Sequence, residues 1–401
     1  MPIVVDIIIG VLEYKDLYFP IGKIFRGGIY LFGLIAAFLK PRKNFFFCWI
    51  VFLWLLSFVF WYLSYDNFSF KRELEFFFKA TYIFPVLSLL SVLENKKYGY
   101  DNTIKQVIKK YTQLAASMIW FSFITGIGLE TYGKWVFGTS SFFKAQNDMG
   151  VVLLIGFTFL LFNKEKMKMT WVWLGIIFMS LILLGTTTGM FGAIIVVLSY
   201  IFLKVIISKI TSIKDLIIRS ILFFTLFFLS ISTIIFLVNY IKASPYYSNK
   251  YEKLLEEGPR STLTDAAKLY LDKRDWEKNV FGEGFSSFTY EFGESAKYLK
   301  QSKKDYKEWL YVETDFYDFY GSLGIVISVF LLFFYLSFLF KSGIVYYNKK
   351  TTYDLSLLII MFMAMIHGWF AGHVFYSPTV LGIFGGIIYL IKTRYNEKAV
   401  F

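Results

Sequence analysis

Three acidic side chains, Glu313, Asp315 and Asp318, stand directly before an apolar block that begins at Gly321. Asp315 and Asp318 are three positions apart, so a helix beginning near Glu313 would carry both on one face. Carboxylates held this close raise the pKa of at least one of them, as a general base requires. Acidic residues also complement the dipole of a helix N-terminus, so a structural interpretation stays open.

Two arginines, Arg260 and Arg274, lie in the same long polar segment, residues 239–320. A guanidinium group binds two phosphate oxygens at once and keeps its charge, which suits a diphosphate ligand. For each arginine, the alternative is an ordinary solvated charge.

Other candidate ligands of a substrate lie near apolar blocks. Arg26, Lys71 and Arg72 are at the outer ends of such blocks, where ionisable groups are costly and tend to line cavities. Snorkelling toward lipid headgroups is the alternative for these long side chains. His373 is a candidate cavity-lining residue, with capping or packing as its alternative. Two histidines and the single Cys48 predict neither a histidine-rich metal site nor a disulfide framework.

Composition assigns the chain to the membrane. It is 57% hydrophobic and 22% aromatic with a mean hydropathy of +0.55, more apolar surface than a water-soluble domain could bury. The net charge of +13 comes from short basic loops, as in membrane proteins, so we expect no nucleic-acid partner.

Continuous apolar blocks predict an all-α, polytopic helical bundle of about twelve spans in one domain, residues 1–401. The first block is short for a span, and a kink is expected at Pro85. The blocks lie at residues 1–11, 21–39, 45–64, 73–93, 105–127, 149–162, 170–184, 189–203, 216–238, 321–340, 355–370 and 374–391.

Basic loops set the expected orientation. The loops at residues 40–43, 96–97, 164–168, 204–219 and 341–350, with the tail, fall on one side, which the positive-inside rule makes cytoplasmic. Segment 239–320 is then an extracytoplasmic loop before the tenth span. Within it, Ser261 or Thr262 could cap a helix that runs to Trp276.

The order of residues in this loop resembles the O-antigen polymerase and O-antigen ligase family, known as Wzy and WaaL. The loop reads R…W-x-x-N-x-F-x-G-x-G…E-x-D-x-x-D…G-x-x-G, and the ending G-H-V-F-Y-S-P (372–378) is similar to capsular-type polymerases. The matching residues are Arg260, Trp276, Asn279, Phe281, Gly282, Gly284, Glu313, Asp315, Asp318, Gly321 and Gly324.

The resemblance implies a metal-independent glycosyltransferase of the GT-C type, without a cofactor, in the bacterial inner membrane. Its substrates would be undecaprenyl-diphosphate-linked oligosaccharides at the outer leaflet, and a chain-length regulator is a candidate partner. Ligases of the family typically carry a His-Asn pair where this chain has Glu313 and Thr314; this favours a polymerase. Many relatives have a basic residue where this chain has Thr187. Other basic residues would therefore have to bind the diphosphate.

We therefore expect an inverting polymerase, in which Glu313 or Asp315 takes the proton of the acceptor hydroxyl. Arg260, Arg274 and the cations Arg26 or Lys71 would hold the leaving diphosphate. A ligase of the same family is the first alternative. A flippase or transporter is the second, although the chain shows no internal repeat of the kind that transporters often carry.

Overall fold

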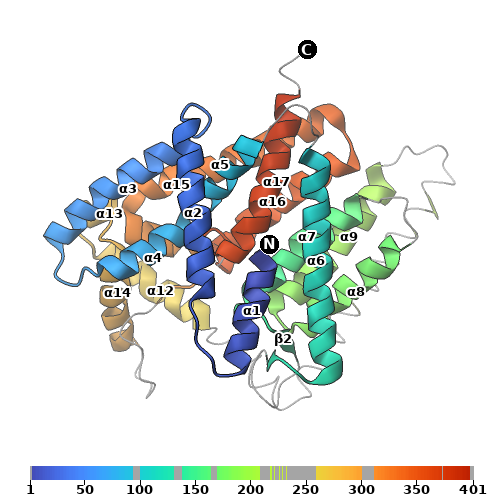
Figure 1. Cartoon of the computed structure of the whole chain (residues 1–401), viewed down its shortest axis with the longest axis horizontal. Helices are drawn as coiled ribbons and strands as arrows, with labels where there is room; N and C mark the ends of the chain where they lie inside the picture. Colours follow the sequence, from blue (N-terminus) through green and yellow to red (C-terminus); the bar gives the residue numbers. More distant parts are fainter. Residues whose placement is uncertain are drawn as a thin grey trace. The chain divides into compact units, whose positions relative to one another are not determined.

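The computed structural model describes residues 2–93, 100–130, 138–163, 169–207, 259–299, 311–372 and 374–397, with isolated positions between 217 and 232. The chain divides into two compact units, Met1–Tyr111 with Arg260–Phe401, and Thr112–Pro259. Almost all of the described chain is helical (Figure 1). The single domain predicted from the sequence stays a prediction.

Four described helices are long and apolar enough to cross a membrane: α2 (Ile21–Leu39), α3 (Phe45–Ser64), α15 (Asp315–Lys349) and α16 (Thr352–Phe370). The bent pair α4 (Phe70–Ala80) and α5 (Ile83–Leu93) would make a fifth. Large apolar side chains stay exposed on these helices, for example Phe38 and Leu63, as expected for surfaces that face lipid. The chain is a helical membrane protein by these features, but the count of about twelve spans is not confirmed.

The first unit is built around α2 and α5. Gly33 of α2 lies so close to Pro85 of α5 that an added Cβ would come within 2.2 Å of the proline Cβ. Helices α1 (Pro2–Tyr14) and α17 (Pro378–Asn396) pack on this pair, α1 against α2 and α17 against α5. α15 and α16 pack against each other, and α15 also contacts α17 and α3.

The kink predicted at Pro85 was wrong in position, because the chain bends between α4 and α5. The two helices are bent by 50° at residues 81–82. The Thr81 hydroxyl donates to the Phe77 carbonyl at 2.6 Å and lies 2.6 Å from the Tyr30 hydroxyl of α2. Pro85 falls in the first turn of α5, where its missing N–H leaves no intrahelical bond unmade.

Residues 259–299 of the polar segment form three shorter helices: α12 (Pro259–Asp272), α13 (Trp276–Phe281) and α14 (Phe285–Leu299). The expected helix from Ser261 to Trp276 is thus two helices, because α12 ends at Asp272 and Asp275 is extended before α13. Helix α12 packs on α14 through an apolar face: Ala266, Ala267 and Leu271 are buried with Phe288 and Phe292 of α14.

The second unit contains the end of α6 (Tyr100–Thr125), the strands β1 (Leu129–Glu130) and β2 (Thr139–Ser141), and the helices α7 (Gln146–Phe162), α8 (Thr170–Leu183) and α9 (Thr187–Ile207). The strands pair antiparallel. Helix α7 is buried from Met149 to Phe162 and packs on α8 and α9. The Thr186 hydroxyl accepts from the Gly189 amide at 3.2 Å, so it satisfies the first turn of α9.

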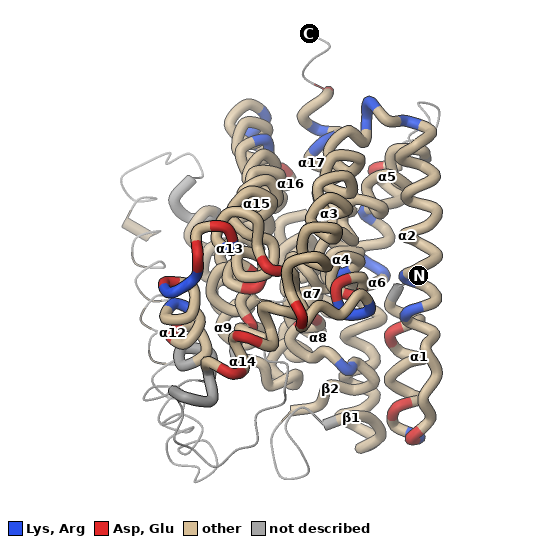
Figure 2. The backbone as a smooth tube through the Cα atoms, turned by 90° about the vertical axis from the view of Figure 1, so that its left-hand side faces the viewer, with Lys and Arg blue, Asp and Glu red and all other residues tan. Residues whose placement is uncertain are grey.

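One group of basic residues of the first unit lies at one end of its helices. Figure 2 shows Lys and Arg at the turn between α2 and α3 and at the ends of α15 and α17. The ends of α15 and α17 are joined there, since Lys349 contacts Glu397 and Arg394 binds Asp354 of α16. The expected grouping of the loops at 40–43 and 341–350 with the C-terminal tail is consistent with this arrangement. The basic loops at 96–97 and 164–168 lie outside the described residues.

Candidate functional site

The acidic cluster lies where α15 begins, because the helix starts at Asp315 and carries both aspartates in its first turn. The Asp315 side chain is buried. Its Oδ2 accepts hydrogen bonds from the backbone amides of Val374 (3.0 Å) and Phe375 (2.9 Å). The carboxylate therefore ties the loop between α16 and α17 to the start of α15.

Asp318 is buried one turn further along α15. Its Oδ1 accepts from the Val312 amide at 3.0 Å, and its Oδ2 accepts from the Tyr376 hydroxyl at 3.3 Å. Buried carboxylates need such partners, because an unsatisfied one is costly. Asp315 and Asp318 thus hold the two loops that flank the helix start.

Glu313 differs from the two aspartates in being only half-buried. Its backbone is left-handed, with φ of 66°, a strained conformation for a residue with a Cβ. Gly372 packs on it, also with positive φ, so closely that an added Cβ would come within 2.4 Å of the Glu313 carbonyl oxygen. Non-glycine residues held this way cluster at functional sites, so Glu313 is the candidate reactive carboxylate.

An apolar cavity of about 210 Å³ opens beside this cluster. Asp315 is the only acidic residue that lines it among the described residues. The rest of its wall comes from α15 and α16 and from Phe375, and it is almost entirely apolar and aromatic. Its principal lining residues are Phe316, Phe319, Ile325, Val329, Leu332 and Trp369.

Helix α4 brings cations to the same region. Phe76 of α4 stacks on Phe285 at 4.0 Å and lies 6.3 Å from the Tyr376 ring. Burial raises the pKa of Tyr311, Asp318 raises it further, and Arg72 lowers it. Lys71 is exposed beside Arg72.

Glu73, also on α4, was missed by the sequence reasoning. Its carboxylate is fully buried and accepts from the Phe285 amide (2.9 Å) and the Ser286 hydroxyl (2.6 Å), as well as from the Ser286 amide. It therefore caps the N-terminus of α14 from a helix 212 positions away in the chain. No local sequence pattern signals a cap supplied from such a distance.

The remaining predicted cations are not all in one place. Arg26 of α2 donates to Asp6 of α1 at 3.2 Å, an interaction between helices. Arg260 opens α12, and His373 lies outside the described residues. Arg274 has a side chain only 1% exposed and lies 3.6 Å from Glu283, which also pairs with Lys278 at 3.2 Å.

A second, polar cavity of about 450 Å³ lies on the helices of the polar segment. Its wall comes from α12, the turn that precedes α13, α13 itself and α14. It is lined by Ala266, Leu269, Tyr270, Lys273, Arg274, Asp275, Lys278, Glu291 and Ser295.

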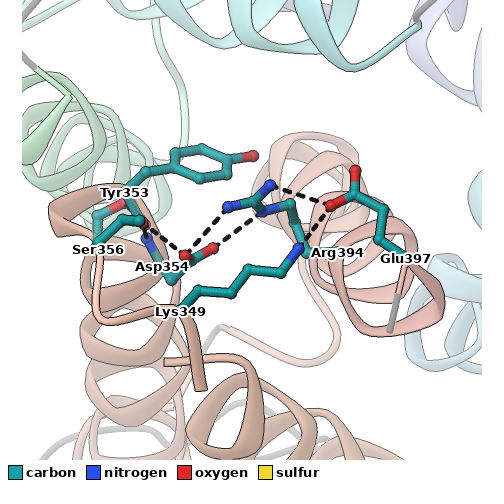
Figure 3. A network of polar contacts seen from close by, with 7 residues as sticks. Lys349, Tyr353, Asp354, Ser356, Arg394 and Glu397 are labelled. Carbon is teal, nitrogen blue, oxygen red and sulfur yellow. Dashed lines mark hydrogen bonds and ion pairs between the residues drawn. The ribbon is translucent and has the colours of Figure 1, made fainter. Parts of the chain in front are cut away.

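A third polar network has a structural character (Figure 3). Arg394 binds the fully buried Asp354 in a bidentate manner, at 3.0 Å and 3.1 Å, and lies 5.4 Å from the Tyr353 ring. Asp354 also belongs to the N-terminal cap of α16, where Thr351 accepts from its amide. This network locks α16 to α17 at the basic end of the unit.

Comparison with known proteins does not assign the chain: no family model matches it, and no curated protein sequence matches it. Among the described residues, no group of three or more His, Cys, Asp or Glu side chains could hold a metal ion.

Proposed function

We propose that this protein is a polysaccharide polymerase of the inner bacterial membrane. It would transfer a glycan from undecaprenyl diphosphate to the non-reducing end of another lipid-linked repeat unit. The observation that carries the proposal is the position of Asp315. Its carboxylate binds the loop at residues 374–375, and the same residue lines the apolar cavity. A reactive polar cluster thus adjoins an apolar groove, as a substrate with a sugar diphosphate head and an isoprenoid tail requires.

In this proposal the acceptor hydroxyl attacks the anomeric carbon of the donor sugar. The bond between that carbon and the diphosphate oxygen breaks, diphosphate leaves with the electron pair, and the anomeric configuration inverts. The hydroxyl proton passes to a carboxylate. We assign it to Glu313, because Glu313 is only half-buried whereas Asp315 and Asp318 are fully buried.

Cations near the cluster would stabilise the charge that diphosphate gains as it leaves. We assign this role to Arg72, because it lies on α4, whose Phe76 stacks on Phe285 and lies 6.3 Å from the ring of Tyr376. Lys71 is exposed at the adjacent position and is the second candidate for this role. Arg26 is paired with Asp6, so we assign it to helix packing. Activity on the extracytoplasmic side, and contact with a chain-length regulator, are parts of the same proposal.

The test replaces the three carboxylates with their amides in the host from which the gene has been deleted. Asn can accept both amide hydrogen bonds at position 315. At position 318 it can accept from Val312 while donating to the Tyr376 oxygen. Asp315→Asn and Asp318→Asn therefore remove a negative charge and keep the hydrogen bonds to the two loops. Glu313→Gln removes the charge of a half-buried side chain. Glu294→Gln on α14 serves as a control, because it changes the same charge outside the cluster.

Surface glycan from wild type and Glu294→Gln should run as a ladder on a gel. Glu313→Gln should give only single repeat units at an unchanged protein level. A full ladder from Glu313→Gln, Asp315→Asn and Asp318→Asn alike would overturn the site. Long chains that remain on the lipid, with failure to reach a different acceptor only in the variants, would point to a ligase. Lipid-linked units that accumulate inside the cell would point to a flippase.

A further inference from the structure

The polar cavity on α12–α14 has no role in the chemistry proposed above. It lies on the helices of the polar segment and contains Arg274, a residue expected from the sequence to bind diphosphate. At about 450 Å³ it falls within the usual size range of small-molecule sites. Its wall carries both hydrogen-bond donors and acceptors.

The charges around this cavity cancel. Glu283 lies behind the wall, within 3.6 Å of Arg274 and 3.2 Å of Lys278, and its charge must be counted with those of the lining. Among the described residues, the charged side chains on the wall or paired with it are Lys273, Arg274, Lys278, Asp275, Glu283 and Glu291. These three positive and three negative side chains balance one another. A diphosphate would gain little from it, whereas an uncharged polar ligand could use both signs.

The buried guanidinium of Arg274 is incompletely satisfied. One nitrogen, Nη2, donates to the Lys278 carbonyl at 2.7 Å. Nε and Nη1 are buried and have no hydrogen-bond partner among the described residues. Buried donors of this kind are rare in folded proteins and point to a role beyond packing.

Tyr270 completes the arrangement. Its hydroxyl donates to Glu283 at 2.8 Å, which fixes the ring, and the half-buried ring lies on the cavity wall. The Arg274 guanidinium is 5.9 Å from the ring centroid. An orientated aromatic ring beside paired donors and acceptors matches the surface of a sugar, which has an apolar face and a rim of hydroxyl groups.

We propose that this cavity binds uncharged sugar residues of the growing glycan, with Lys273, Glu291 and Ser295 contacting hydroxyl groups and Tyr270 packing against a sugar ring. The identity of the sugar as part of an acceptor glycan rests on the proposed polymerase function. Saccharide binding by the cavity does not. Arg274 is accordingly a positioning residue of the cavity wall and not a ligand of diphosphate.

The test uses the full chain in lipid nanodiscs and the exposed Trp276, which begins α13 next to the cavity-lining Asp275. Its fluorescence is titrated with two probes, the repeat-unit oligosaccharide freed from its lipid by mild acid, and inorganic pyrophosphate. The variants are Lys273→Gln and Glu291→Gln at the cavity rim. Lys268→Gln on α12 is the matched control, because Lys268 forms only an exposed pair with Asp265.

Wild type and Lys268→Gln should bind the oligosaccharide equally, and each rim variant should bind it at least about tenfold more weakly, as expected for loss of a hydrogen bond to a charged group. Absence of oligosaccharide binding to wild type, or equal binding by the rim variants, would overturn the proposal. Saturable pyrophosphate binding that Lys273→Gln removes would also overturn it, in favour of an anion site.

Failure of this inference is separable from failure of the proposed function. A chain that makes a glycan ladder but binds oligosaccharide equally well in all variants is a polymerase without this sugar site. A chain that binds oligosaccharide through the rim residues but makes no ladder has the sugar site and another activity.

Discussion

Gly282 and Gly324 meet backbone to backbone. A Cβ added to Gly324 would come within 2.3 Å of the Gly282 amide nitrogen, and one added to Gly282 would come within 2.4 Å of the Ser322 carbonyl oxygen. Both residues have positive φ, and the turn after α13 fits into the break that Gly324 makes in α15. We call this backbone contact between Gly282 and Gly324 the joint. It places α13 and α14 beside the acidic cluster.

Alanine at either glycine should separate the joint. Gly282→Ala and Gly324→Ala introduce both a steric clash and a positive φ, so each should lower the free energy of unfolding by more than about 2 kcal/mol. Gly343→Ala, in the same helix α15 with no atom near its added Cβ, is the matched control and should be neutral or stabilising. Thermal unfolding of the purified variants in detergent measures this. Equal unfolding temperatures for all three would contradict the joint.

Glu73 should matter much more than its neighbour Glu75. Glu73→Gln loses at least one of the hydrogen bonds that cap α14, at a cost of about 1–3 kcal/mol. Glu75→Gln removes only a partly exposed ion pair with Lys23, which contributes less than about 1 kcal/mol. Chemical unfolding of both variants in the same detergent checks the difference. A larger effect at Glu75 would show that the cap is not formed.

Stability should depend on pH through Glu283. Burial raises the pKa of its carboxyl above the ordinary value of 4.5, and Arg274 and Lys278 oppose part of this increase. Between 4.5 and the raised pKa the folded protein binds more protons than the unfolded chain. The free energy of unfolding therefore falls as the pH rises through this window.

Glu283→Gln removes that titration. The difference in unfolding free energy between wild type and this variant should change steadily above pH 4.5 and become constant once Glu283 is ionised in the folded state. Asp265→Asn, at an exposed carboxylate on α12, should follow the wild-type curve. Parallel curves for wild type and Glu283→Gln across the whole range would show that the carboxyl titrates normally.

The α16–α17 lock should depend on Arg394 and not on the lysine beside it. Arg394→Ala leaves the buried Asp354 without its bidentate partner, which should cost about 3 kcal/mol. Lys349→Ala removes only a contact with the exposed Glu397 and should change stability by less than about 0.5 kcal/mol. Thermal unfolding of the single and double variants measures both. Equal losses from the two substitutions would contradict the assignment.

The apolar cavity should be sensitive to its volume if it holds an isoprenoid tail. Val329→Trp fills it from α15, and Phe333→Trp changes an exposed position on the same helix that does not line it. In a purified assay, Val329→Trp should raise KM for a donor with a full-length tail and leave KM unchanged for a short-tailed analogue. Phe333→Trp should behave as wild type. Equal effects on both donors would place the tail elsewhere.

The sequence by itself determined the helices that are apolar along their length. The predicted blocks 21–39 and 45–64 coincide with α2 and α3, because hydrophobicity over a span is a local property of the chain. The sequence predicted the tenth apolar block only from residue 321, whereas α15 begins at Asp315. The break at residues 81–82 was not predicted either, because the contact there joins the hydroxyl groups of Thr81 and Tyr30 on two different helices.

The tertiary structure alone decided how the polar residues are used. Asp315 reaches the loop at 374–375, Glu73 caps a helix 212 positions away, and Arg274 turns inward to Glu283. Each charged group had many possible partners in the sequence. Burial selects among them, because a charge removed from water must be paired or hydrogen-bonded, and only packing brings distant segments close enough to do so.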